Sequence, residues 1–223
     1  MEIVAEEVVA LVERELAEHA NPIAAQKMSA YMKNRFTFYG IASPLRKNIC
    51  RHIYEAIGRP TNVVSIAKQL WVKPQRELHY IAQEMLLRGK KEWTPDFVYD
   101  LEWFISTNSW WDTVDFIASN LVAEYFKKWP ECKKEIVLGW NNSDNMWLVR
   151  TSIVFQLKYK NEVDTEILQT CIIKHSSSKE FFIKKAIGWS LRQYAKYDAE
   201  WVQDFLENNE LQTLSVREAT KHF

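Results

Sequence analysis

DNMWLVRTSIVFQLKYK, residues 144–160, resembles KEFFIKKAIGWSLRQYAK, residues 179–196, in the order of its bulky, basic and apolar residues. In both stretches apolar residues recur at intervals of three and four, which is the spacing of one face of an α-helix. Trp147 and Phe182 lie 35 residues apart. Similar helices at such an interval are typical of an α-solenoid, in which each repeat packs on its neighbours. We therefore predict an all-α superhelical solenoid.

The rest of the chain gives the same helical pattern. Gln75–Lys91 has a similar order of residues, and Asn21-Pro22 places a capping residue before a proline at the first helical position. Ser109 and Asp112 have the spacing of a capping box. No segment shows the sustained alternation of a β-strand. The sequence predicts about eleven to thirteen helices in a single domain over residues 1–223.

The 35-residue interval also connects four polar residues, Tyr80, Asp115, Arg150 and Lys185. Each falls in about the second turn of its expected helix. Stacked repeats place equivalent positions side by side, so these residues are expected to line up on one face. Solenoids commonly bind their partners on the concave face. The register therefore predicts a continuous polar surface there.

Composition excludes several classes of protein. The chain has 223 residues, of which 47% are hydrophobic and 26% charged, so it can bury a core and is not disordered. Five glycines argue against glycine-rich phosphate loops. No apolar run is long enough for a membrane span, and the N-terminus lacks the pattern of a signal peptide. The three cysteines and five histidines lack metal-ligand spacing. We expect a cytoplasmic protein with reduced thiols and without a metal or other cofactor.

The distribution of charge leaves the partner open. The formal net charge is zero, which by itself argues against nucleic acid as a partner. Residues 21–91, however, carry thirteen Lys or Arg against three Glu, and residues 174–196 carry six against one. Such segregation could place a basic stripe on one face. It is also what ordinary solvated helix faces produce.

The string SWWDTVD, residues 109–115, is the densest candidate for chemistry. Trp111 and Asp115 are four residues apart, so a helix places the indole and the carboxylate on one face. The next repeats bring Arg150, and then Trp189 one turn after Lys185. Stacking would gather these groups into one cleft.

Two interpretations of that cleft remain open. In the structural one, Trp111 and Trp189 are core residues, and Asp115 and Arg150 form an ion pair between repeats. In the functional one, the two indoles flank a carboxylate and cradle a cationic ring. An ionised Asp115, expected at its ordinary pKa, would stabilise an oxocarbenium-like sugar or position water. Arg150 would hold a backbone phosphate as a fork.

Several strings resemble the AlkD-type family of alkylpurine DNA glycosylases. The resemblance covers almost the whole chain and is carried by residues 109–115, SDNMWLVR at 143–150, SKEFFIKKAIGW at 178–189, Asn21-Pro22, MSAYMKN at 28–34, NNEL at 208–211 and REATKH at 217–222. It implies HEAT-like helical repeats that wrap duplex DNA along a concave face. It also implies excision of N3- and N7-alkylated purines by a monofunctional glycosylase without metal or cofactor, with the lesion trapped while it remains in the duplex.

The resemblance implies a role for five residues. Asp115 matches the family's catalytic aspartate, Trp111 and Trp189 match its cleft tryptophans, and Arg150 matches its phosphate-contacting arginine. Tyr31 matches a tyrosine that lines the DNA-facing cleft. The catalytic set that the resemblance implies is Asp115, Trp111, Trp189 and Arg150.

We expect Lys184, Lys185 and Arg192 to contribute further DNA contacts with Tyr31 and Arg150, although each of these three lysines and arginines taken singly is more often solvated. The expected partner is double-stranded DNA containing alkylated purines, bound by a monomer without an obligate protein partner. The alternative function is a non-catalytic helical-repeat scaffold that binds nucleic acid or protein along its concave face. Recognition of undamaged or branched DNA without base removal is a third, weaker option.

Overall fold

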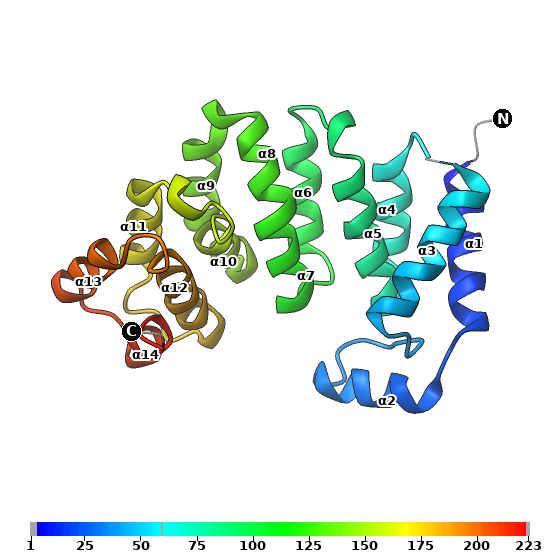
Figure 1. Ribbon diagram of the computed structural model, residues 1–223, viewed down its shortest axis with the longest axis horizontal. Coiled ribbons are helices and arrows are strands. Elements are labelled where there is room, and N and C mark those ends of the chain that lie inside the picture. The colour runs from blue at the N-terminus through cyan, green and yellow to red at the C-terminus, as the bar shows by residue number, and fades with distance from the viewer. Residues whose placement is uncertain (1–3, 59, 222–223) are drawn as a thin grey trace. The chain divides into compact units, whose positions relative to one another are not determined.

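Helices make up most of the computed structural model, which describes residues 4–58 and 60–221 (Figure 1). Within those residues no β-strand forms, and the bridge between Thr37 and Gln75 is isolated. The described part of the chain has fourteen α-helical segments, two of which join into one continuous helix. The predicted all-α fold is confirmed. His222, which ends one of the family-like strings, lies outside the described residues.

The chain divides into two compact units, Met1–Trp93 and Thr94–Phe223. The helices of unit 1 are α1 (Ala5–Glu18), α2 (Pro22–Tyr31), α3 (Ser43–Ile57), α4 (Val63–Trp71) and α5 (Arg76–Arg88), followed by a 3-10 turn at Lys90–Glu92. Helix α1 packs on α3 and α4, and α4 packs on α5. The assignment of residues 1–223 to one domain stays a prediction.

Unit 2 contains the helices that carry most of the candidate site. They are α6 (Phe97–Ser106), α7 (Trp111–Phe116), a π-helical segment (Ile117–Val122), α8 (Ala123–Lys128), α9 (Lys133–Asn141), α10 (Met146–Val154), α11 (Thr165–Lys174), α12 (Phe181–Tyr194), α13 (Ala199–Asn208) and α14 (Thr213–Ala219), with 3-10 turns at Pro130–Cys132 and Lys160–Glu162. Helix α10 packs on α9, α11 and α12, and α12 packs on α13 and α14. Figure 1 shows α12 and α14 next to each other.

Hydrogen bonds between successive repeats of unit 2 keep a nearly constant sequence interval. Tyr159 Oη donates to the carbonyl of Ala123 at 2.8 Å across 36 residues, and Ser190 Oγ donates to the carbonyl of Ile153 at 2.9 Å across 37 residues. Contacts between nearest-neighbour repeats define a solenoid. The interval near 35 predicted from the sequence therefore corresponds to the stacking of helix pairs in unit 2.

One of two helix caps predicted from the sequence is present in the structure, and the other is not. Asn21 caps α2 as predicted, because its Oδ1 accepts the N–H of Ala24 at 3.0 Å. The capping box predicted at Ser109 is wrong. Trp110 is the N-cap of α7, and Ser109 Oγ donates to the carbonyl of Ile105 at 2.6 Å. Ser109 thereby closes the end of the preceding helix instead of opening the next one.

The helix that begins at Trp111 changes its winding directly after Asp115. Residues Ile117–Val122 are π-helical, and the chain then continues as α8. Two side chains bond to carbonyls before this segment: Ser119 Oγ donates to Asp115 O and Asn120 Nδ2 donates to Phe116 O, both at 2.8 Å. A π-helical turn widens the helix and frees carbonyls from the usual ladder. These two side chains satisfy such carbonyls where the winding changes.

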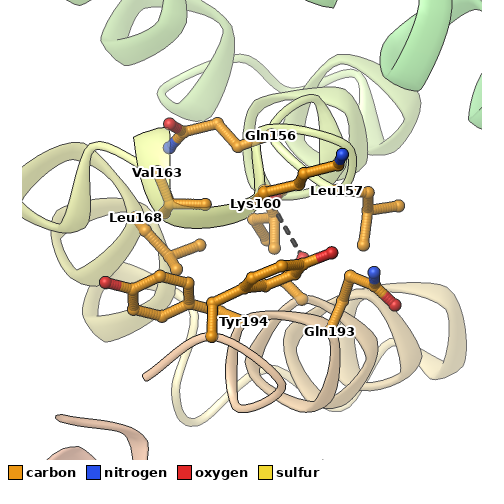
Figure 2. Close-up of a pocket in the computed structure, with 10 residues that line it drawn as sticks. Gln156, Leu157, Lys160, Val163, Leu168, Gln193 and Tyr194 are labelled. Carbon is orange, nitrogen blue, oxygen red and sulfur yellow. Dashed lines mark hydrogen bonds between the residues drawn. The ribbon is translucent and has the colours of Figure 1, made fainter. Parts of the chain in front are cut away.

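The core of unit 2 is tightly packed around α10 and α12. A hollow of about 10 Å³ lies between the end of α10, α11 and α12 (Figure 2). Figure 2 shows the ring of Tyr194 below Leu157 and Lys160, and the dashed line marks the bond from Ser190 to Ile153. A hollow of this size is about one water molecule. It therefore has no room for a ligand.

The crossing of α12 and α14 depends on a glycine. A Cβ on Gly188 would lie 2.4 Å from Glu218 Cβ and 2.6 Å from the carbonyl oxygen of Ser215. We expect Gly188→Ala to destabilise the fold by about 2 kcal/mol, because the two helix backbones must separate. Gly139→Ala in α9 is the matched control: its Cβ would meet nothing within 4 Å. The control should stabilise by about 0.5–1 kcal/mol. Urea unfolding measures both, and equal stabilities would contradict the close crossing.

Candidate functional site

Asp115 and Arg150 form a two-pronged ion pair between successive repeats. Arg150 Nε donates to Asp115 Oδ1 at 2.7 Å, and Arg150 Nη2 donates to Asp115 Oδ2 at 2.9 Å. The side chains are 14% exposed for Asp115 and 5% exposed for Arg150. Asp115 lies in α7 and Arg150 in α10, so the 35-residue register brings them together as predicted. Charge-assisted bonds in this fork geometry are among the stronger interactions in proteins.

A cluster of rings fixes the Arg150 side of the pair. The Trp110, Trp147 and Phe182 rings lie with centroids 5.0 to 5.7 Å apart, and Arg150 Nη1 donates to the carbonyl of Phe182. The three rings stand at or next to the N-terminal ends of α7, α10 and α12. Sequence reasoning missed this cluster as part of the site, although Trp147 and Phe182 share the 35-residue interval. The rings and the carbonyl together leave the guanidinium little freedom to move.

The two indoles assigned to the cleft are half-buried. Trp111 is the first residue of α7, four residues before Asp115, and Trp189 lies in the middle of α12. Neither belongs to the buried core of unit 2. Partial exposure is what a ligand-contacting indole requires, whereas a core indole would be fully covered. That the two rings flank Asp115 in one cleft stays a prediction.

The environment of Asp115 differs from the expectation of an ordinary pKa. Burial raises the pKa of the Asp115 carboxyl, because removal from water disfavours its charged form. The hydrogen bonds and positive charge of Arg150 act in the opposite direction and hold the ionised form. The repeat register predicted Arg150 beside Asp115. The burial of Asp115 could not be predicted in the same way, because it depends on how the helices pack.

Two of the three basic residues of α12, Lys185 and Arg192, are bound to a buried carboxylate. Glu218 of α14 accepts Lys185 Nζ at 2.9 Å, Arg192 Nη1 at 3.0 Å and Lys221 Nζ at 2.7 Å. Its side chain is 5% exposed, and the three cations hold the pKa of its carboxyl at about 2. Lys184, by contrast, is half-buried on α12, where its carbonyl accepts Ser215 Oγ at 3.1 Å. The 35-residue series does not include Glu218, which lies 33 residues after Lys185.

Removal of this carboxylate should weaken the fold in a pH-dependent way. We expect Glu218→Gln to lower the free energy of unfolding at neutral pH by about 2 kcal/mol, since three charge-assisted bonds are lost. The folded-state pKa of Glu218 lies below its ordinary value of 4.5, so its contribution is present above pH 4.5 and lost as the pH falls toward 2. Urea unfolding of both proteins at several pH values measures the difference. A difference that does not shrink on acidification would contradict this assignment, and the exposed Glu210→Gln is the control.

Tyr31 lies in unit 1, at the end of α2. Its side chain is 69% exposed, and it lines a cavity together with Phe38 and Tyr80. The structure therefore gives Tyr31 an accessible ring, as a DNA-contacting residue requires. Its place relative to Asp115 stays a prediction of the family resemblance.

The cysteines are reduced, and two of them are shielded from reaction. Cys50 and Cys171 are buried, and burial raises the pKa of each thiol to about 11. Thiols that remain protonated are poor nucleophiles. In the described part of the chain, no helix is both long and apolar enough to cross a lipid bilayer.

Comparison with known proteins identifies the family of this chain. Residues 12–223 match the model of a family described as DNA alkylation repair enzyme. The fold is similar to a solved structure described as a predicted DNA alkylation repair enzyme from Enterococcus faecalis, with a TM-score of 0.85 and 30% sequence identity over 92% of this chain and 96% of that one. No curated protein matches the chain. Because the family model covers nearly the whole sequence, the chain belongs to the DNA alkylation repair enzyme family.

Proposed function

We propose that the protein is a monofunctional DNA glycosylase that hydrolyses the N-glycosidic bond of cationic N3- and N7-alkylated purines in duplex DNA. Membership of the repair family supports DNA as the substrate. The observation that carries the proposal is the Asp115–Arg150 pair, which gives a buried carboxylate two charge-assisted hydrogen bonds at one helical turn from a half-buried indole. Metal and cofactor are not part of the proposed reaction.

The chemistry requires a negative charge near the sugar. Cleavage of the bond between C1′ and N9 leaves its electron pair on the alkylated purine, which departs as a neutral base. The sugar becomes oxocarbenium-like, and Asp115 stabilises this positive charge. A water oxygen then bonds to C1′ and loses one proton to Asp115 or to solvent. Each carboxylate oxygen bonded to Arg150 can accept a further hydrogen bond.

The neighbouring groups would bind the damaged strand. Trp111 and Trp189 would contact the damaged nucleotide, since indole faces attract a cationic ring. Arg150 uses three of its five N–H groups within the protein, which leaves two for a phosphate oxygen. Tyr31 would line the DNA-facing surface.

Lys184, Lys185 and Arg192 would contact the phosphate backbone. Because Lys185 and Arg192 are already paired with Glu218, their gain from a phosphate would be smaller than that of a free cation. We further propose that the protein acts as a cytoplasmic monomer.

A scaffold without catalysis is the second candidate. It is favoured by the same ion pair, because both oxygens of Asp115 already have a strong donor inside the protein. A buried pair of this kind can serve to hold two repeats in register. On this alternative the protein binds DNA or protein without removing a base.

The direct test is base release from a duplex with one N7-methylguanine. We expect the protein to release the free base faster than the spontaneous loss measured without protein, and to leave a matched unmodified duplex intact. If folded protein binds the duplex and releases neither N7-methylguanine nor an N3-alkylated purine, the glycosylase proposal fails and the scaffold remains.

The pH dependence of base release should report on Asp115. Its raised pKa means that the carboxyl is protonated, and its charge lost, at a higher pH than an ordinary aspartate. Base release is therefore expected to fall on the acid side while the fold persists, because protonation of a group with a raised pKa favours the folded state. Single-turnover rates measure base release, and circular dichroism over the same pH range measures whether the fold persists. Activity loss that coincides with unfolding would contradict the prediction.

A further inference from the structure

Unit 1 contains a cavity whose lining, apart from Tyr31, takes no part in the proposed function. It has a volume of about 350 Å³ and opens between α2, α3 and α5. Its apolar lining is formed by three aromatic residues and three aliphatic or thioether residues, Tyr31, Phe38, Tyr80, Met28, Met32 and Ile41. The volume falls at the lower end of the range of small-ligand sites, about 300–1,000 Å³. It is sufficient for one planar ring system.

Arg46 supplies an unused hydrogen-bond donor at this cavity. It is one of the lining residues, and its side chain is 8% exposed. Its Nη2 donates to Glu84 Oε1 at 2.7 Å, and its guanidinium lies 5.0 Å from the centre of the Tyr80 ring. Its Nε–H is buried and has no acceptor among residues 4–58 and 60–221. Buried donors in proteins nearly always have a partner, so this one indicates a missing acceptor.

The charges around the cavity indicate which acceptor fits. Glu84 already compensates the charge of Arg46, so a neutral acceptor suffices at Nε. Glu77 also lines the cavity, but its carboxylate accepts the backbone N–H groups of Tyr39, Gly40 and Ile41 at 2.8 to 3.1 Å. Glu77 is 1% exposed, and its carboxylate oxygens are occupied by these backbone N–H groups. A cationic ligand would therefore find no available anion.

We propose that this cavity binds a single unpaired nucleobase of DNA. The ring would stack on the aromatic lining, as bases do in proteins that bind single strands. A ring nitrogen or carbonyl oxygen of the base would accept the Arg46 Nε–H after a small rotation of that side chain. Lys27, an exposed residue of the lining, would meet the attached phosphate. The inference rests on the proposed function for its partner, DNA, and assigns to unit 1 a site of its own.

The test compares a duplex carrying one bulged 2-aminopurine with the same duplex fully paired, neither containing a lesion. We expect the full-length protein to bind the bulged duplex about tenfold more tightly, and to change the 2-aminopurine emission on binding. Ser43→Trp should abolish that preference, because Ser43 is an exposed lining residue whose replacement fills the cavity without removing a buried contact. Ser65→Trp, at an exposed position of α4 that does not line this cavity, should keep the preference.

Arg46→Lys separates the donor from the charge. Lysine keeps a cation for Glu84 but lacks the Nε–H of the guanidinium, so the preference for the bulged duplex should fall while binding to the paired duplex stays. Equal affinity of the unaltered protein for the two duplexes, or a preference that survives Ser43→Trp, overturns the inference. Base release from N7-methylguanine by the same proteins shows whether the proposed function stands or fails independently.

Discussion

Asp115→Asn is expected to lower base release from an N7-methylguanine duplex by at least about a hundredfold. Removal of one preorganised group that stabilises transition-state charge costs about 10²–10³ in rate. Asparagine keeps the size of the side chain but removes the negative charge from a site where burial makes charge more effective. Single-turnover release, corrected for spontaneous loss of the alkylated base, measures the effect.

Two controls make this result specific. DNA binding by Asp115→Asn should persist, because the phosphate contacts proposed for Lys184, Lys185 and Arg192 do not depend on this carboxylate. Asp204→Asn removes a negative charge from an exposed position of α13 and should leave the rate within about threefold. An unchanged rate in a folded Asp115→Asn protein would remove Asp115 from the mechanism and favour the scaffold.

Arg150→Met is expected to destabilise the fold by about 3–5 kcal/mol, the cost of leaving one partner of a buried ion pair unpaired. Asp115 would lose the donors to both of its oxygens, and the carbonyl of Phe182 would lose its donor as well. Methionine keeps a similar length and remains compatible with the ring cluster. Urea unfolding gives the free energy directly.

The double variant identifies the cause of that loss. In the Arg150→Met background, Asp115→Asn should recover part of the stability, because the unpaired buried charge is no longer present. Replacement of the exposed Arg217 by Met should change stability by less than about 0.5 kcal/mol. A loss of similar size in both arginine variants, or no recovery in the double variant, would contradict a buried pair.

The sequence predicted the contact between Asp115 and Arg150, because repeat register alone determines which residues of neighbouring helices meet. The register did not predict Glu218 as the partner of Lys185, because Glu218 lies outside the series. Helix α14 approaches α12 at Gly188, and a close crossing of that kind is set by local packing and not by the repeat interval. The raised pKa of Asp115 escaped prediction for a related reason, since burial is a property of the assembled unit.

Two local features of the helices could not be predicted from the sequence pattern: the hydrogen bond of Ser109 and the π-helical segment. The Ser109 hydroxyl was predicted to cap the following helix. In the structure it donates instead to the carbonyl of Ile105, in the preceding helix. The apolar residues of the π-helical segment at Ile117–Val122 continue the apolar pattern of the helix before it. Nothing in the spacing distinguishes it from an α-helix. The assignment of the indoles, Tyr31 and the lysines to DNA contacts stays a prediction of the family resemblance.

The change of winding after Asp115 has a consequence for how such a protein can evolve. In an α-helix each residue turns the chain by about 100°, so an insertion normally rotates everything that follows it. A π-helical turn absorbs an extra residue locally. The orientation of Trp111 and Asp115 is thereby uncoupled from that of Tyr125 and Phe126, which are buried in the core behind them. Selection could alter the end of this helix that carries Trp111 and Asp115 while the folding requirements of its other end remained unchanged.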